Sequence, residues 1–224
     1  MKFIDKLTSV IAPHNCIVCR SEGAILCESC YLSEFVPKIS SCFLCNKATN
    51  NFSTCQNCQR KTPIKQLYVA TYLDKYSQEM VHRLKFDRLY GAGDRIAQIL
   101  RENSPPMSKD TIITYVPTSP DRVRKRGYDH ARLIANSFAQ MHGLACLPFV
   151  AKINATRQVG ANKKQRADQA SNAYTTLKRD VDPKRKIILI DDIITTGATL
   201  GACVKIMKKA GYKNVTCLVF ASKA

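Results

Sequence analysis

Eight of the 11 cysteines form four Cys-x-x-Cys pairs within the first 60 residues. The pairs are Cys16/Cys19, Cys27/Cys30, Cys42/Cys45 and Cys55/Cys58. A gap of two residues lets both thiolates of a tight turn face one ion, and two such turns complete the tetrahedron of sulfur ligands that structural zinc prefers. We therefore expect two structural zinc ions in this segment, with a single zinc ion as the alternative.

Other chemistries of paired cysteines fit this spacing less well. A disulfide framework belongs to exported chains, whereas reduced cytosolic thiols prefer metal. Iron–sulfur sites usually include three closely placed cysteines rather than four separated pairs. Pairing in sequence order would give two consecutive zinc ribbons and alternate pairing would give a cross-brace; the spacing leaves both open.

A second group of polar residues follows an apolar run near the C-terminus. The run 187–190 is aliphatic and continues into Asp191 and Asp192, and a Thr/Gly turn then opens a helix; the turn residues are Thr195, Thr196, Gly197, Ala198 and Thr199. Backbone N–H groups, hydroxyls and a helix N-terminus suit a phosphate. Carboxylates suit sugar hydroxyls and hydrated Mg²⁺. A sugar phosphate is the expected ligand; two acids that simply end a strand are the alternative.

This element resembles the signature of type I phosphoribosyltransferases: four apolar residues, two acids and a Thr-Thr-Gly-x-Thr loop. The resemblance implies that Asp191 and Asp192 hold the ribose hydroxyls of 5-phosphoribosyl 1-diphosphate (PRPP) with Mg²⁺ and are the candidate catalytic residues. It further implies that residues 195–199 cradle the 5-phosphate.

A basic segment in mid-chain extends the resemblance. It contains Arg122, Arg124, Lys125 and Arg126, followed by Gly127-Tyr128-Asp129-His130. Together with the cysteine pairs and the PRPP-type loop, it makes the chain similar to the ComF family, phosphoribosyltransferase-like proteins with an N-terminal zinc module that are associated with natural competence and DNA uptake. That family usually has Arg-Gly-Phe-Asn-Gln here, so Asp129 and His130 depart from its pattern.

The charge distribution supports a polyanionic partner. Residues 1–60 hold six basic and four acidic side chains, so nearly all of the net charge of +18 lies in residues 61–224. Clustered cations bind phosphates by releasing condensed counterions. The candidate cations are Arg122, Arg124, Lys125, Arg126, Lys163, Lys164 and Arg166. They would grip single-stranded DNA or the leaving pyrophosphate, or simply form a solvated surface; Tyr128 is the candidate aromatic for base stacking.

Two functions are therefore expected. The first is a ComF-like protein that handles single-stranded DNA during uptake and has a Mg²⁺-dependent PRPP site, with other competence or recombination proteins as further candidate partners. The second is an active phosphoribosyltransferase that acts on an unidentified nitrogenous acceptor.

The remaining pattern predicts the elements that position these groups. Strands are expected at 67–73, 111–116, 186–190 and 215–221, and helices at 78–86, 94–102, 131–141 and 198–210. This alternation is typical of an α/β fold with a parallel sheet. We expect a zinc-ribbon module at 1–62 and a phosphoribosyltransferase-like domain at 63–224. No apolar run is long enough to cross a membrane, and no export signal is recognisable, so a cytoplasmic protein is expected.

Overall fold

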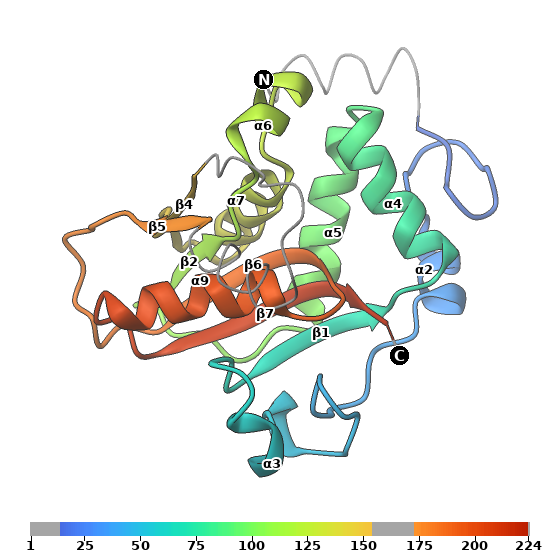
Figure 1. Cartoon of the computed structure of the whole chain (residues 1–224). Coiled ribbons are helices and arrows are strands. Elements are labelled where there is room, and N and C mark those ends of the chain that lie inside the picture. Colours follow the sequence, from blue (N-terminus) through green and yellow to red (C-terminus); the bar gives the residue numbers. More distant parts are fainter. Residues whose placement is uncertain (1–13, 154–172, 224) are drawn as a thin grey trace, which may run out of the picture.

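A five-stranded parallel sheet forms the centre of the computed structural model, which describes residues 14–153 and 173–223 (Figure 1). The strand order is β1-β7-β6-β2-β3, and every neighbouring pair runs parallel. The strands are β1 (Leu67–Tyr72), β2 (Ile112–Tyr115), β3 (Ala145–Cys146), β6 (Ile187–Ile194) and β7 (Val215–Ser222). The predicted α/β class is confirmed.

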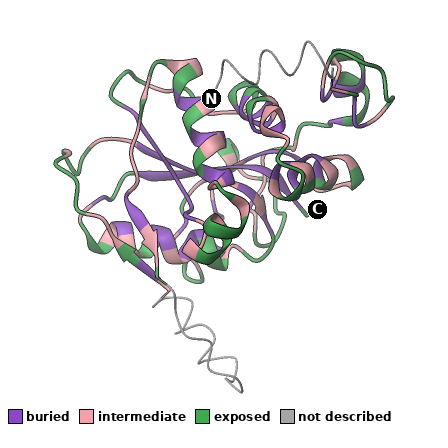
Figure 2. Ribbon diagram, turned by 90° about the horizontal axis from the view of Figure 1, so that it is seen from above, coloured by how far each residue is buried: buried purple, intermediate pink, exposed green. Residues whose placement is uncertain are grey.

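Helices cover both faces of this sheet, as its buried strands require. One face packs against α4 (Lys75–Phe86), α5 (Tyr90–Glu102) and α7 (His130–His142), and the other packs against α9 (Ala198–Lys209). Side chains alternate between the faces: Ile188 and Ile190 join the first core, whereas Ile187 and Leu189 join the second. Figure 2 shows these central strands as buried.

A short antiparallel pair of strands adds to the second face. It consists of β4 (Val150–Lys152) and β5 (Tyr174–Thr176), and its buried residues Phe149, Val150 and Tyr174 pack with the core on the α9 side. This pair brings two segments that are distant in the sequence to the same side of the sheet as α9.

The connections that leave the adjacent strands β2 and β6 run to opposite faces of the sheet. From β2 it continues through α6 (Pro120–Arg126) and α7 on one face to β3, whereas from β6 it continues through α9 on the opposite face to β7. Ligands of open α/β sheets bind where neighbouring connections diverge in this way, beyond the carboxyl ends of the strands. The topology therefore places the site at the ends of β2 and β6.

The two cysteine-rich segments lie on separate sides of the molecule. Figure 1 shows α2 (Glu28–Glu34), in the first segment, beside α4, and α3 (Gln56–Gln59), in the second, below β1. The first segment shares the core of the main sheet, because its residues Ile17, Leu26 and Phe35 belong to the same buried cluster as the residues of α4 and α5. The second contains the short helix η1 (Asn50–Phe52), which contacts β1.

The predicted elements occur with two informative differences. The strand expected at 186–190 continues through both aspartates to Ile194, because β7 goes on pairing with it after β2 has ended. The basic segment at 120–126 forms the helix α6. In the part of the chain that the structure describes, no helix combines the length and apolarity needed to span a bilayer.

Candidate functional site

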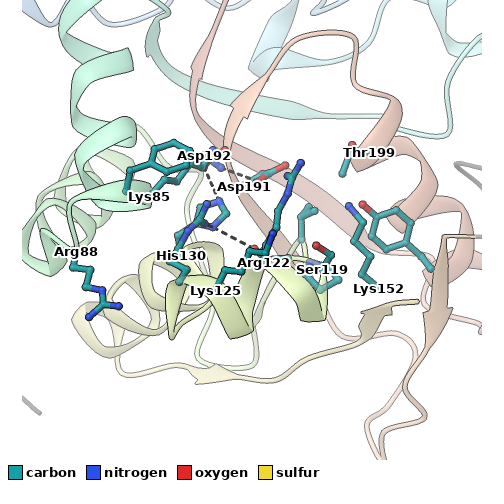
Figure 3. A pocket seen from close by; sticks show the side chains of 16 residues that line it. Lys85, Arg88, Ser119, Arg122, Lys125, His130, Lys152, Asp191, Asp192 and Thr199 are labelled. Carbon is teal, nitrogen blue, oxygen red and sulfur yellow. Dashed lines mark hydrogen bonds and ion pairs between the residues drawn. The ribbon is translucent and has the colours of Figure 1, made fainter. Parts of the chain in front are cut away.

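A cleft of about 820 Å³ opens at the carboxyl ends of β2 and β6 (Figure 3). Its lining includes the two aspartates, six cations and two aromatic rings: Lys85, Phe86, Arg88, Arg122, Lys125, Arg126, Lys152, Tyr174, Asp191 and Asp192. The cations outnumber the carboxylates three to one. The cleft is therefore suited to a ligand that carries several negative charges.

Asp191 and Asp192 lie inside β6 at the point where β2 no longer pairs with it. Val116 donates the last backbone hydrogen bond from this side, to the carbonyl of Ile190, and Pro117 has no N–H to continue the ladder. The β2 side of β6 is thereby open to the cleft. Successive residues of a strand point to opposite faces, so the two carboxylates have different surroundings.

Asp192 is held by a lysine and a histidine from different helices. Its Oδ2 is 2.5 Å from Lys85 Nζ at the end of α4 and 2.8 Å from His130 Nε2 at the start of α7. Arg126 lies 2.6 Å from Nδ1 of the same ring. Because a guanidinium can only donate, Nδ1 is the acceptor, and the proton on Nε2 is donated to Asp192.

The pKa values of the two carboxyl groups are shifted in opposite directions. Burial, and then the charge of Asp192, raises the pKa of Asp191 well above its ordinary value. Burial also raises the pKa of Asp192, but the hydrogen bond from His130 and the charge of Lys85 outweigh burial and hold that pKa below its ordinary value. Asp191 has no such partner: within the described residues, no cationic side chain forms an ion pair with it. Asp191 is the carboxylate that an incoming cation or sugar hydroxyl would complement.

The Thr/Gly turn forms a small second hollow next to the cleft. This hollow of about 60 Å³ is lined by Asp191 and residues 193–200, and it shares Asp191 and Thr199 with the cleft. Gly197 caps α9 with a left-handed φ of 73°, which glycine adopts without steric cost. The exposed N-terminus of α9 and the hydroxyls of Thr195, Thr196 and Thr199 suit a phosphate group.

The basic helix α6 directs only some of its cations into the cleft. Arg122, Lys125 and Arg126 line the cleft, as their spacing of three and four residues on a helix allows. Arg124 is not among the lining residues; it is exposed and pairs with Asp121 on α6. The other predicted basic group, Lys163, Lys164 and Arg166, lies outside the described residues.

The exposed aromatic ring of the cleft is Phe86. Its residue is 65% exposed, and Arg126 lies 5.4 Å from the centre of its ring. Tyr128, the aromatic expected from the sequence, is half-buried: its hydroxyl donates to the carbonyl of Leu84, and its ring packs edge-on against Tyr90 at 4.9 Å. Phe86 ends the helix predicted at 78–86, and helical periodicity does not show which apolar residue of a helix lies beyond the core.

Four other residues that line the cleft were not predicted to belong to the site from the sequence. Lys85 lies in the last turn of α4 and Arg88 follows that helix. Lys152 and Tyr174 face one another from β4 and β5, with Lys152 Nζ 5.4 Å from the centre of the ring. Burial, and then the charge of Arg122, lowers the pKa of Lys152. The one sequence signal for Lys85 and Arg88 was their positive charge, which did not show that they reach the aspartates.

Asp129 and His130, which depart from the family pattern, have structural roles. Asp129 is the N-cap of α7: its Oδ1 accepts from the backbone N–H groups of Ala131 and Arg132, and its Oδ2 accepts from that of Thr118. It is not among the residues that line the cleft. His130, in contrast, contacts Asp192. The carboxylate of Asp129 therefore caps α7, whereas the histidine takes part in the site.

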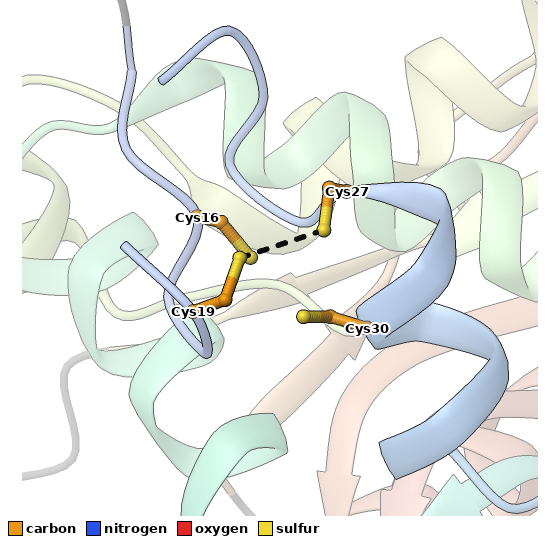
Figure 4. Close-up of side chains that lie close together, drawn as sticks. All are labelled: Cys16, Cys19, Cys27 and Cys30. Atoms are coloured by element: carbon orange, nitrogen blue, oxygen red, sulfur yellow. Dashed lines mark hydrogen bonds between the residues drawn. The ribbon is translucent and has the colours of Figure 1, made fainter. Parts of the chain in front are cut away.

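Each group of four cysteines converges on one point. Cys16, Cys19, Cys27 and Cys30 form the first cluster, and Cys42, Cys45, Cys55 and Cys58 form the second; within each cluster all sulfur atoms lie within 4.8 Å of one another. Figure 4 shows the first. The pairing follows the sequence order, so the cross-brace alternative is wrong.

The sulfur spacing fits a metal ion. Tetrahedral Zn–S bonds of about 2.3 Å give sulfur–sulfur edges of about 3.8 Å. Cys19 and Cys27 have their sulfur atoms 3.7 Å apart, and the equivalent pair Cys45 and Cys55 is at 3.6 Å. Both clusters also share one burial pattern, with two buried thiols and one exposed thiol. Two Cys₄ sites that could bind zinc are therefore present.

Comparison with known proteins agrees with this architecture. Residues 123–224 match the phosphoribosyl transferase domain. The chain is 24% identical over 217 residues to competence protein F of Haemophilus influenzae, covering 90% of this chain and 93% of that one. It is 25% identical over 213 residues to competence protein ComFC of Streptococcus pneumoniae, covering 93% of each.

Solved structures give a weaker likeness. An allosteric regulatory enzyme of purine biosynthesis aligns with a TM-score of 0.43 and 17% identity, over 58% of this chain and 25% of that one, so this chain spans about a quarter of its length. Adenine phosphoribosyltransferase from Saccharomyces cerevisiae aligns with a TM-score of 0.37 and 17% identity, over 62% and 71% of the two chains. Over about nine-tenths of its length the chain is thus similar to these two competence proteins, and it joins a phosphoribosyl transferase domain to two four-cysteine clusters.

Proposed function

We propose that this chain is a competence-associated, phosphoribosyltransferase-like protein of the cytoplasm that binds PRPP with Mg²⁺ and handles single-stranded DNA. The observation that carries the proposal is that three features meet in the cleft and the hollow beside it: the Asp191/Asp192 pair, the Thr/Gly turn of residues 195–199 and six cations. Phosphate, ribose hydroxyls and pyrophosphate each find complementary groups there.

Each part of PRPP is assigned to a different group of residues in the cleft and the hollow beside it. The turn would receive the 5-phosphate, and Asp191 would accept hydrogen bonds from the ribose hydroxyls, while Lys85 and His130 hold Asp192 in place beside it. Arg122 and Lys125 would face the pyrophosphate. When bound, Mg²⁺ would neutralise charge on the pyrophosphate oxygens, with Asp191 as its neighbour in the protein.

Zinc in both cysteine clusters is part of the same proposal. Four thiolates at tetrahedral spacing, with no carboxylate among the residues of either described cluster, suit zinc better than a hard cation. Its role would be structural, because all four coordination positions are filled by the protein.

Single-stranded DNA would follow the cationic rim of the cleft. Such binding requires cations that track the backbone and an aromatic ring on which bases stack. Arg122, Lys125 and Arg126 on α6 supply the cations, and the exposed ring of Phe86 supplies the aromatic face.

Removing the α6 cations should change the salt dependence of this binding. If about four phosphates are neutralised, log affinity falls with log salt at a slope of about −3, and removing three cations should flatten it by about 2. We expect this for Arg122→Ala, Lys125→Ala and Arg126→Ala combined, measured by fluorescence anisotropy with a labelled oligonucleotide. Arg124→Ala on the same helix is the matched control and should keep the slope; equal slopes for all proteins would contradict the assignment.

Replacing the exposed ring should weaken DNA binding at every salt concentration. Stacking contributes about 1–3 kcal/mol per base, so Phe86→Ala should bind about 5- to 100-fold more weakly. Quenching of a 2-aminopurine-labelled strand reports the stacking itself. Leu32→Ala, which removes an exposed apolar side chain far from the cleft lining, is the control; an unchanged signal in Phe86→Ala would remove the ring from the DNA path.

An active transferase is the second candidate, favoured by the size of the cleft. A volume of about 820 Å³ lies in the range of small-molecule sites and would accommodate a small acceptor beside PRPP. An acceptor nitrogen would bond to C1 of the ribose as the bond from C1 to pyrophosphate breaks, and the nitrogen would lose its proton to water. Release of pyrophosphate across a panel of nitrogenous bases tests this reaction; no release with any base would leave binding as the function.

A further inference from the structure

Phe43 lies between the first two cysteines of the second cluster, and its ring reaches the Thr/Gly turn. A Cβ placed on Gly197 would lie 2.8 Å from Cε2 of Phe43 and 3.6 Å from its Cζ. Phe43 also packs on the core that contains Ile194 and Leu200, the residues on either side of the turn. The ring therefore packs directly against the turn that is proposed to bind phosphate, although it does not line the hollow itself.

Buried neighbours on both sides hold the turn in place against the ring of Phe43. Ile194 and Leu200 are 4% and 1% exposed, and Ile194 Cδ1 would lie 3.4 Å from the same Cβ position. Gly197 thus meets two constraints at once, a left-handed φ and a neighbouring ring too close for any larger residue. With Phe43 absent, the turn would lose the ring that packs against Gly197.

The backbone of the second cluster fixes the position of Phe43. The turn that carries it is closed by hydrogen bonds from Cys42 N to Lys47 O at 2.8 Å and from Asn46 N to Cys42 O at 2.8 Å. Behind it, Thr54 N donates to Lys65 O, and Lys208 of α9 donates to the carbonyl of Pro63. The cluster is therefore attached both to the turn at the start of α9 and to a lysine near its end.

We propose that Phe43 is a positioning residue that sets the shape of the phosphate-binding turn, so that the second cysteine cluster supports the ligand site as well as its own fold. The inference rests on the proposed function, because it assigns the turn a phosphate. The first cluster has no equivalent contact: in the described residues, the ring that touches Gly197 comes from the second.

Three variants separate this role from general packing. Phe43→Ala removes the ring, Phe43→Leu keeps apolar volume at the same position, and Phe52→Ala is the matched control. Phe52 lies in the same cysteine-rich segment, but its ring packs on Tyr68 at 5.0 Å. All three are compared as the full chain with its metal, after thermal unfolding has confirmed that each is folded.

Hydrogen exchange of residues 195–200 tests the positioning without any ligand. We expect faster exchange in Phe43→Ala than in wild type, near-wild-type exchange in Phe43→Leu, and no change in Phe52→Ala. Unchanged exchange in Phe43→Ala, or equal acceleration in Phe52→Ala, would overturn the inference whether or not PRPP binds.

Calorimetry with PRPP and Mg²⁺ gives the second readout. A hydrogen bond to a charged group contributes about tenfold or more in affinity, so Phe43→Ala, with its turn displaced, should bind PRPP about tenfold more weakly while its affinity for single-stranded DNA stays the same. Equal PRPP affinity in wild type and Phe43→Ala would overturn the positioning role. Absence of PRPP binding in wild type would instead overturn the proposed function, and the exchange result would still decide the role of Phe43.

Discussion

Removing metal from the protein should unfold it rather than merely loosen its N-terminal part. Structural zinc contributes about 10–16 kcal/mol of apparent free energy, whereas a whole domain is stable by about 5–15 kcal/mol. The first cluster lies in the main core: Cys16 is fully buried, and Leu26 and Phe35 share that core with Leu84 and Phe220. Its collapse would expose one face of the sheet.

Elemental analysis and thermal unfolding measure this effect together. We expect about two zinc ions per chain, and a large fall in Tm with loss of helical circular dichroism after treatment with a chelator. Cys30→Ser should reproduce the loss, whereas Cys146→Ser, outside both clusters, should keep both metals. A metal-free protein with the original Tm would refute the structural role.

Asp191→Asn should make the protein more stable and less able to bind PRPP. Because the pKa of Asp191 is raised in the folded state, the ionised carboxylate costs stability above that pKa, and the cost disappears in acid, where the group is protonated in both states. The variant should therefore exceed wild type in Tm in mildly alkaline buffer, and the difference should vanish as the pH falls.

The same change should weaken Mg²⁺-dependent PRPP binding. A hydrogen bond to a charged group contributes about 1.5–3 kcal/mol, or about 10- to 100-fold in affinity. Asp121→Asn is the matched control, since that carboxylate lies on the neighbouring helix α6 but does not line the cleft. A variant that loses stability, or that keeps full PRPP affinity, would contradict the environment assigned to Asp191.

Local patterns predicted the parts of the site that are continuous in the sequence. The members of each Cys-x-x-Cys pair, Asp191 and Asp192, and the turn at 195–199 lie within a few residues of one another, so residue types and spacing were enough to single them out. The assignment of the aspartates and the turn to PRPP came from the family resemblance. The alternation of strands and helices likewise predicted the parallel sheet. Such features can be predicted without knowing which residues far apart in the sequence are in contact.

The rest of the site depends on the tertiary fold. Lys85 is more than one hundred residues from Asp192, and only the packing of α4 beside β6 brings the two together. The sequence could not show that Phe86 faces the cleft and Tyr128 packs inward, because both are apolar rings near helix ends. Nor could it pair the cysteines, since both arrangements satisfy the same spacing.

Calorimetric titration of PRPP into the zinc-loaded full chain, with and without Mg²⁺, tests the central claim most directly. We expect one binding site per chain, with affinity that depends on Mg²⁺ and falls in Asp191→Asn but not in Asp121→Asn. The absence of binding, or binding that is independent of both Mg²⁺ and Asp191, would contradict the assignment of the cleft at the ends of β2 and β6 as a PRPP site.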